Sequence, residues 1–375
     1  MTQVSSFEKK INKFFNKKDL NQIINYFLNK KKKNLNELIF LIRKVLENKI
    51  NKNLKKNIIL KKNINFEIKK LKYGYLNYKE WMVLSNILLM CGLVIESYKI
   101  KLISFKAYEN KNQIFFNLKK YLFYKIIISK KKNFFKSNFF FILIKIFFKF
   151  YFFLKFYNKD FSKLIKNKTI NIIGPSEFKN TKKNKIKKGD LVVRFSYFGQ
   201  QLDKNYFNKL KPNISYLNGQ SIDEINLDKS LIKRIKKIKI DFLCLKKKSV
   251  NKFITNQRVY FNTNFFFSGS PNMLQHCLVD LLFHGAKNIK LNNINFYLDK
   301  NPYHKNYAIL KNIKHNSLKE YWLYGFAIHD WYCNFLFIKY LYYKKLISVS
   351  DEIKKILKLD DLKIYKLIEK YYSFF

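Results

Sequence analysis

Short apolar segments that alternate with turns and helical patterns fill the chain after Lys168, and this alternation limits its fold more than any other feature. The segments are rich in Ile, Leu, Val, Phe and Tyr. They occupy residues 169–174, 190–199, 212–219, 241–245 and 288–298. Strands that alternate with helices usually form an open, mostly parallel sheet. The sequence therefore predicts an α/β fold, with a Rossmann-like, mostly parallel open sheet in the C-terminal half.

The N-terminal part has a different texture, with lysine-laced helical periodicity and almost no proline. Apolar residues recur there at spacings of three and four, which is typical of helices with one buried face. Within residues 77–109, Gly92 separates two apolar-faced runs and predicts a helical hairpin. We predict two domains: an all-α, Lys/Asn/Phe-rich region over residues 1–165 that serves as a membrane-surface or docking module, and an α/β domain with C-terminal helices over residues 166–375.

A long aromatic stretch, residues 138–157, raises the question of a membrane span. Lys145, Lys149 and Lys155 interrupt it and fall within about 120° of one another on a helix. Each lysine near a bilayer centre would cost about 2.5 to 3.5 kcal/mol, so a helix lying in the membrane surface is favoured over a spanning one. The same aromatic face would suit packing on the second domain, and both interpretations stay open.

The charge of the chain is strongly positive, with 76 Lys and Arg against 25 Asp and Glu and a formal net charge of +51. Such a surface attracts phosphates, which makes nucleic acids and anionic membranes candidate partners. Lys, Asn, Ile and Phe are, however, the residues that A/T-rich DNA encodes by default, so the charge alone identifies no partner. No RRM, KH, zinc-finger or helix-turn-helix signature accompanies the lysines, and no specific nucleic-acid partner is predicted.

Cysteine usage and the N-terminal residues bear on the compartment. The cysteines are Cys91, Cys244, Cys277 and Cys333. They are widely spaced among apolar neighbours, as reduced buried thiols would be. Residues 1–15 carry charges where a secretory signal would need an uninterrupted apolar run. We therefore expect a cytoplasmic protein, peripheral on the inner face of the membrane if the helix at 138–157 binds lipid.

Candidate ligand-binding residues follow the predicted strands. Gly174 ends the first strand, where the missing Cβ would let the backbone approach a ligand, and Ser176 could donate its hydroxyl to a phosphate. An ordinary Gly-Pro-Ser turn would also account for these residues. Arg194 ends the second strand, and Asn218 and Gly219 end the third. Ligands of parallel sheets bind at the carboxyl ends of strands, so these residues are predicted to border one site.

The segment from residue 268 to 289 predicts a capped helix with an anion site at its N-terminus. Ser270 is the candidate N-cap, Pro271 fits the first helical position and Gly285 would close the helix. Unpaired N–H groups and the positive end of the helix dipole would meet a phosphate there. The residues predicted to border that phosphate are Ser268, Gly269, Ser270 and Asn272.

Two further groups of residues suit chemistry. His276, Asp280 and His284 are four apart on the same helix, but helical zinc sites normally bring a further ligand or a catalytic carboxylate, so no metal is predicted. His329 and Asp330 precede an aromatic helix. A histidine there could accept a proton near neutral pH, with Asp330 or a backbone carbonyl orienting its ring. Helix capping is the structural alternative for this pair.

Taken in order, several segments resemble the large, small and very short motifs of the sialyltransferase family, particularly of its bacterial members. The segments are residues 170–177, 189–195, 216–219, 269–297 and 326–330. The resemblance extends from about residue 168 to 357. It implies an inverting glycosyltransferase that needs neither metal nor cofactor and moves sialic acid or a related sugar from a CMP-linked donor to a glycan or lipid-linked acceptor.

The resemblance also assigns roles to residues. Gly174, Ser176 and Asn218 would line the nucleotide site, the turn at 268–270 would hold the donor phosphate, and His329 would take the proton from the acceptor hydroxyl.

The family pattern is not followed everywhere. Pro175 and Ser196 stand where the family has Asn, and Asn334 stands where it has Glu. A non-catalytic membrane-surface protein with a degenerate nucleotide-sugar fold therefore stays an alternative, as does an RNA-binding accessory factor for which only the net charge speaks.

Overall fold

The structure is a computed structural model of the 375-residue chain. It describes residues 78–90, 92–105, 156–176, 186–197, 210–238, 240–247, 256–260, 263, 270–299 and 318–373. The chain forms two compact units that interleave along the sequence. A helical unit contains the described residues up to 105 together with 318–328 and 360–373, and an α/β unit contains the others.

Some of the sequence predictions concern residues outside this set. The predicted membrane-surface helix lies, up to residue 155, outside the described residues, as do all residues before Tyr78. The domain boundary at residue 165 stays a prediction.

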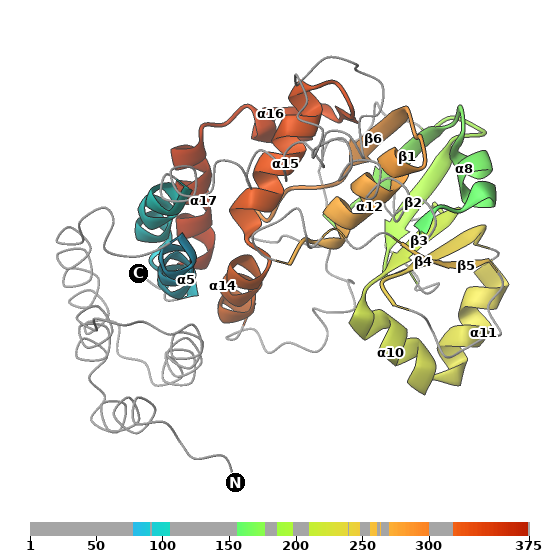
Figure 1. Cartoon of the computed structure of the whole chain (residues 1–375), viewed down its shortest axis with the longest axis horizontal. Coiled ribbons are helices and arrows are strands. Elements are labelled where there is room, and N and C mark those ends of the chain that lie inside the picture. The colour runs from blue at the N-terminus through green and yellow to red at the C-terminus, as the bar shows by residue number, and fades with distance from the viewer. Residues whose placement is uncertain are drawn as a thin grey trace, which may run out of the picture. The chain divides into compact units, whose positions relative to one another are not determined.

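The α/β unit is organised around a seven-stranded sheet in the order β5-β4-β3-β2-β1-β6-β7, in which every neighbouring pair is parallel (Figure 1). The strands are β1 (Thr169–Ile173), β2 (Leu191–Phe195), β3 (Ile214–Leu217), β4 (Phe242–Leu245), β5 (Gln257–Val259), β6 (Asn288–Asn292) and β7 (Ser348–Val349). Strands buried on both faces tend to read as continuous apolar runs, as β4 does here, whereas β1 and β3 each include one buried polar residue, Asn171 and Ser215. The predicted α/β fold with a parallel sheet is confirmed.

The strand order reverses between β1 and β6. Strands β1 to β5 are added side by side in chain order, and the chain then returns to place β6 on the other side of β1. The register pairs Ile173 with Asn292, so Gly174 and Asn293 follow neighbouring strands at the same edge. In open parallel sheets, ligands bind at the carboxyl edge where the order reverses. The topology therefore singles out the ends of β1 and β6.

Helices cover both faces of this sheet (Figure 1). Those described in the α/β unit are α8 (Lys159–Ile165), α10 (Gly219–Leu227), α11 (Lys229–Ile238), α12 (Met273–Phe283), α15 (Trp331–Tyr343) and α16 (Asp351–Leu357). Helices α10 and α11 pack on the face that carries Leu217 and Leu243. Helices α8 and α12 pack on the opposite face, where Phe242 contacts Phe161 of α8 and Tyr216 contacts α12.

A buried ion pair lies between β5 and α12. Arg258 donates to both carboxylate oxygens of Asp280, at 2.5 and 2.9 Å, and the Tyr216 hydroxyl donates to the same carboxylate at 2.6 Å. Both charged side chains are almost completely buried. Burial alone would raise the pKa of Asp280, but the charge and hydrogen bonds of Arg258 outweigh it and hold that pKa below its ordinary value. The Phe161 ring lies 4.3 Å from the guanidinium carbon and covers it.

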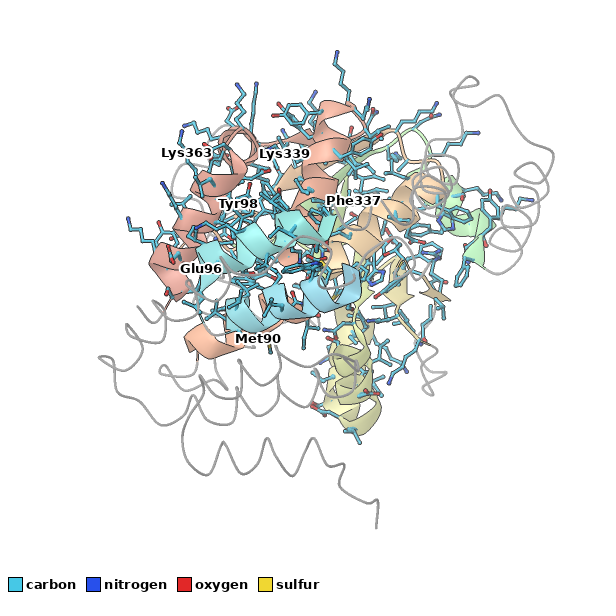
Figure 2. The ribbon with its side chains drawn as sticks, turned by 60° about the vertical axis from the view of Figure 1, so that its left-hand side comes forward. Met90, Glu96, Tyr98, Phe337, Lys339 and Lys363 are labelled. Atoms are coloured by element: carbon cyan, nitrogen blue, oxygen red, sulfur yellow. The ribbon has the colours of Figure 1, made fainter. Side chains whose placement is uncertain are left out.

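The helical unit contains α5 (Tyr78–Met90), a helical segment over residues 94–105, α14 (Leu318–Ile328) and α17 (Asp361–Tyr372). Figure 2 shows Met90 at the end of α5 and Glu96 and Tyr98 on the helix that runs back beside it. Gly92 has a φ of 76° at the turn, which glycine adopts without a steric penalty. Ser85 and Ser97 hydrogen-bond across the two helices. The predicted helical hairpin is confirmed.

No helix within the described ranges combines the length and the apolar character that crossing a membrane requires.

The Asp280 pair yields a stability prediction. Asp280→Asn leaves the Arg258 charge buried without its counter-ion, so we expect urea denaturation to show a loss of about 3 to 5 kcal/mol in the free energy of unfolding. The matched control is Asp160→Asn, because the ion pair between Asp160 and Lys163 is largely exposed. That variant should change the free energy by less than about 0.5 kcal/mol. Similar losses in both variants would contradict the prediction.

The same pair predicts a pH dependence. The folded-state pKa of Asp280 is lowered from 3.8, so its stabilising contribution is present above that pH and disappears as the pH falls through the folded-state value. The difference in unfolding free energy between the wild type and Asp280→Asn should therefore be constant near neutrality and shrink in acid. Denaturation series at several pH values would measure it, and a difference that grew in acid would contradict the assignment.

Candidate functional site

The first turns of α12 and α15 are tied together by hydrogen bonds. His329 Nδ1 lies 3.0 Å from the Ser270 carbonyl oxygen, just before α12. Asn334 accepts a hydrogen bond from the Asn272 backbone N–H at 3.1 Å, and its own carbonyl accepts one from Gln275 at 3.0 Å. The Asn334 amide also donates back to the His329 carbonyl. His329 is thereby fixed beside the N-terminus of α12.

The protonation state of His329 follows from its partner. A carbonyl oxygen can only accept, so Nδ1 carries the proton, and in the neutral ring Nε2 then keeps its lone pair. Burial lowers the pKa of His329; the bond to Ser270 opposes that shift, and the positive charge of Lys246 adds to it. The imidazole is therefore neutral at pH 7. A neutral ring with a fixed tautomer suits the acceptance of a proton at Nε2.

Asp330 acts at the start of α15. It is the N-cap residue with a φ of 44°, and its carboxylate accepts a hydrogen bond from the Cys333 backbone N–H at 3.5 Å. This is the capping role that the sequence left open. Of the two groups expected to orient the His329 ring, the Ser270 backbone carbonyl makes the contact. A catalytic role for Asp330 stays a prediction.

The ends of β2 and β3 come together with the start of α12. Ser196 Oγ lies 2.9 Å from Ser221 Oγ of α10 and 3.9 Å from the sulfur of Met273 in α12. Asn218 accepts a hydrogen bond from the Ser221 N–H at 2.7 Å and so caps α10, directly before Gly219. Asn218 and Gly219, which were predicted to border the site, therefore lie at the same edge of the sheet as Ser196.

Arg194 brings a buried positive charge to this edge. It is 6% exposed, and its guanidinium carbon lies 5.5 Å from the centre of the Tyr197 ring. Burial lowers the pKa of Arg194 to about 10, and the neighbouring Tyr197 opposes the shift only in part. A guanidinium destabilised in this way gains from any anion that binds nearby.

The turns after β1 and β6 are in direct contact. Gly174 donates to the Asn292 carbonyl at 2.9 Å, and the Ser176 N–H donates to the Asn293 carbonyl at 3.1 Å. A Cβ on Gly174 would lie 2.3 Å from the Asn293 oxygen. The close approach that Gly174 permits is therefore made by the turn after β6. A contact between Gly174 and a nucleotide stays a prediction.

Asn293 and Asn295 are functional candidates that the sequence analysis did not single out. Their side chains are 1% and 4% exposed. Within the described part of the chain, both polar atoms of the Asn293 amide and the Asn295 Nδ2 have no hydrogen-bond partner. Each unsatisfied buried group costs about 1 to 3 kcal/mol, so such groups need a reason. The signal available in the sequence was the run of asparagines within the apolar segment 288–298, which the structure ends as a strand at Asn292.

The segment before α12 differs from the prediction in one respect. Ser270 is not the N-cap: Asn272 is, with an extended backbone and no side-chain capping bond, and the helix starts at Met273. Pro271 therefore precedes the helix instead of opening it. Ser268 and Gly269 lie outside the described residues.

The three candidate metal ligands on α12 are each engaged by protein groups, and His284 also contacts the ion pair: its Nδ1 lies 3.5 Å from Asp280 Oδ1 and its Nε2 lies 3.2 Å from Arg258 Nη2. His276 Nδ1 lies 2.8 Å from the Thr263 hydroxyl, Asp280 binds Arg258, and His284 Nε2 accepts the Asn158 N–H at 3.1 Å. Within the described residues, no group of three or more His, Cys, Asp or Glu side chains is arranged to hold a metal ion.

Two glycines of the predicted site should respond differently to substitution. Gly174→Ala forces a Cβ against the Asn293 backbone, so we expect a loss of about 1 to 3 kcal/mol in unfolding free energy. Gly219→Ala is the control, because its Cβ would meet nothing within 4 Å at the start of a helix. It should be neutral or stabilising by up to about 1 kcal/mol. Thermal and urea unfolding of both variants would measure this, and equal effects would refute the close contact.

Comparison with known proteins assigns no function to this site, so its chemistry is inferred from its own side chains and backbone groups. No family model, curated protein or solved structure matches this chain.

Proposed function

We propose that this protein is an inverting, metal-independent glycosyltransferase of the sialyltransferase type, with a Rossmann-like α/β unit and a CMP-linked sugar as donor. The observation that carries the proposal is the neutral His329, held with its proton on Nδ1 beside the start of α12. The order of the motifs that resemble the family supports the choice of donor. The acceptor would be a glycan or a lipid-linked sugar.

The proposed reaction is a single displacement. His329 Nε2 accepts the proton of the acceptor hydroxyl while the acceptor oxygen attacks the anomeric carbon of the donor. The bond from that carbon to the phosphate oxygen breaks, and CMP leaves with the electron pair. Attack from the side opposite the leaving group inverts the configuration. Every bond formed or broken is thereby accounted for, and no covalent enzyme intermediate is needed.

The leaving phosphate would be stabilised by groups at the same edge. Backbone N–H groups at the start of α12 and the positive end of its dipole favour an anion there. Lys246 is close enough to lower the pKa of His329, and Arg194 is a buried cation at the end of β2. These groups act on charge that develops at the phosphate oxygen during bond cleavage. A CMP donor leaves one phosphate, whose charge such groups can meet.

A binding panel tests the donor. The full chain would be heated with CMP, UDP and GDP, each with and without Mg²⁺, in a thermal-shift assay. A ligand at about one hundred times its dissociation constant stabilises the folded state by about 2.7 kcal/mol. We expect a shift with CMP that Mg²⁺ does not change. A shift only with UDP or GDP would change the donor, and no shift with any nucleotide would favour the non-catalytic alternative.

The His329 base is tested by its pH profile. His329→Ala should lower the release of CMP from CMP-sialic acid by about 10² to 10⁴-fold while leaving CMP binding intact. Because the folded-state pKa of His329 is lowered from 6.5, wild-type activity should be flat above pH 6.5 and fall only at lower pH. Undiminished activity in His329→Ala would remove this residue from the mechanism.

A further inference from the structure

We propose that Asn293 and Asn295 form a neutral subsite that hydrogen-bonds an uncharged part of the donor, an inference that rests on the proposed function. A ligand group that fits the two amides would carry a hydrogen-bond donor and a hydrogen-bond acceptor side by side. Both the edge of a pyrimidine base and the hydroxyls of a sugar present this arrangement. These two residues form the amide pair.

The amide pair lies where the strand order reverses. Asn293 follows β6 directly, and the last residue of β6 is in register with Ile173 of β1. Ser176, which follows β1, donates its N–H to the Asn293 carbonyl at 3.1 Å and accepts the Asn295 N–H on its hydroxyl at 3.3 Å. The amide pair is therefore in contact with a residue predicted from sequence to bind the nucleotide.

The amides are held in place and have hydrogen-bonding capacity left over. Asn295 Oδ1 accepts the Tyr297 N–H at 2.9 Å, which orients the amide and leaves Nδ2 unpaired among the described residues. Asn293 is 1% exposed and has both Oδ1 and Nδ2 unpaired within the same residues. Buried polar groups are almost always satisfied in native proteins, so an unsatisfied amide with both functions free indicates a missing partner.

The backbone of this turn is strained, as turns at binding sites often are. Asn293, Phe296 and Tyr297 have φ values of 53°, 53° and 65°, a region that bulky residues rarely adopt. The indole of Trp331 anchors the turn by donating to the Phe296 carbonyl at 2.9 Å. Trp331 is the first residue of α15 and lies two positions after His329. The amide pair and the proposed base are thus fixed by the same helix.

The distribution of charge separates two parts of a ligand. Residues 292–296 contain no ionisable side chain, and neither do residues 174–176. Among the described residues, Arg194 near the end of β2 and Lys246 directly after β4 bring positive charge to this edge. Strand β6 is two places from β2 in the sheet, which is about 10 Å at the usual strand spacing. A phosphate would lie toward β2 and α12, and the uncharged part of the donor toward β1 and β6.

Calorimetric titration of the full chain tests the amide pair with three probes: CMP, cytidine and ribose 5-phosphate. The variant is Asn293→Gly, since glycine accepts the left-handed backbone and removes the amide. Two lost neutral hydrogen bonds correspond to a CMP affinity about tenfold or more weaker. The matched control is Asn167→Gly, an exposed asparagine with a φ of 58° before β1. We expect this control to bind CMP within about twofold of the wild type.

The outcomes separate the ligand sources and the two hypotheses. A loss shared by CMP and cytidine but not by ribose 5-phosphate assigns the subsite to the base, and a loss shared by all three probes assigns it to the ribose hydroxyls. Unchanged CMP affinity in Asn293→Gly overturns the amide pair while the glycosyltransferase proposal stands. A wild type that binds none of the probes overturns both. If circular dichroism shows that Asn293→Gly does not fold, Asn293→Asp, which keeps the volume and loses the amide donor, is measured with cytidine, because this uncharged probe is not repelled by the new carboxylate.

Discussion

The buried ion pair between Arg258 and Asp280 fixes the part of the α/β unit on which the site is built. It joins the short edge strand β5 to α12, and the Tyr216 hydroxyl adds β3 to the same contact. A buried charge without its partner is far more costly than the intact pair, so α12 cannot shift along the sheet without a large penalty. The position of the α12 N-terminus at the carboxyl edge follows from this constraint.

Because α12 is fixed at its centre, the contacts at its start can be precise. Asn334 binds the Asn272 N–H, and His329 reaches the Ser270 carbonyl, so α15 takes its position from α12. Trp331, the first residue of α15, then holds the turn after β6 in place through its hydrogen bond to the Phe296 carbonyl. These contacts connect the buried Arg258–Asp280 pair to the hydrogen bond that sets the tautomer of His329. Rigid elements support functional groups more accurately than loops do, and here two helix starts and two strand ends supply them.

The sequence was informative where local pattern and buried structure coincide. Strand β4 is apolar throughout, β1 is apolar after Thr169 except for Asn171, and Gly174 and His329 stand at turns that the pattern marks. Strands β5 and β7 escaped notice because they have three and two residues, and Arg258 interrupts β5 with a charge. A buried arginine becomes intelligible only through its partner, and Asp280 is on a helix 22 residues later. Asn293 is similar, because it stands out only through its two amide atoms, which have no hydrogen-bond partner among the described residues.

The net charge of +51 and the neutral amide pair act over different distances. A basic surface raises the local concentration of any phosphate-bearing ligand, and salt screens this attraction within about 8 to 10 Å. It therefore cannot distinguish CMP from another nucleotide or from a nucleic acid. Discrimination needs directional groups that stay buried and unsatisfied when the wrong ligand binds, because an unpaired polar group costs more than a hydrogen bond gains. In this chain the asparagines after β6 meet that requirement, and the lysines do not.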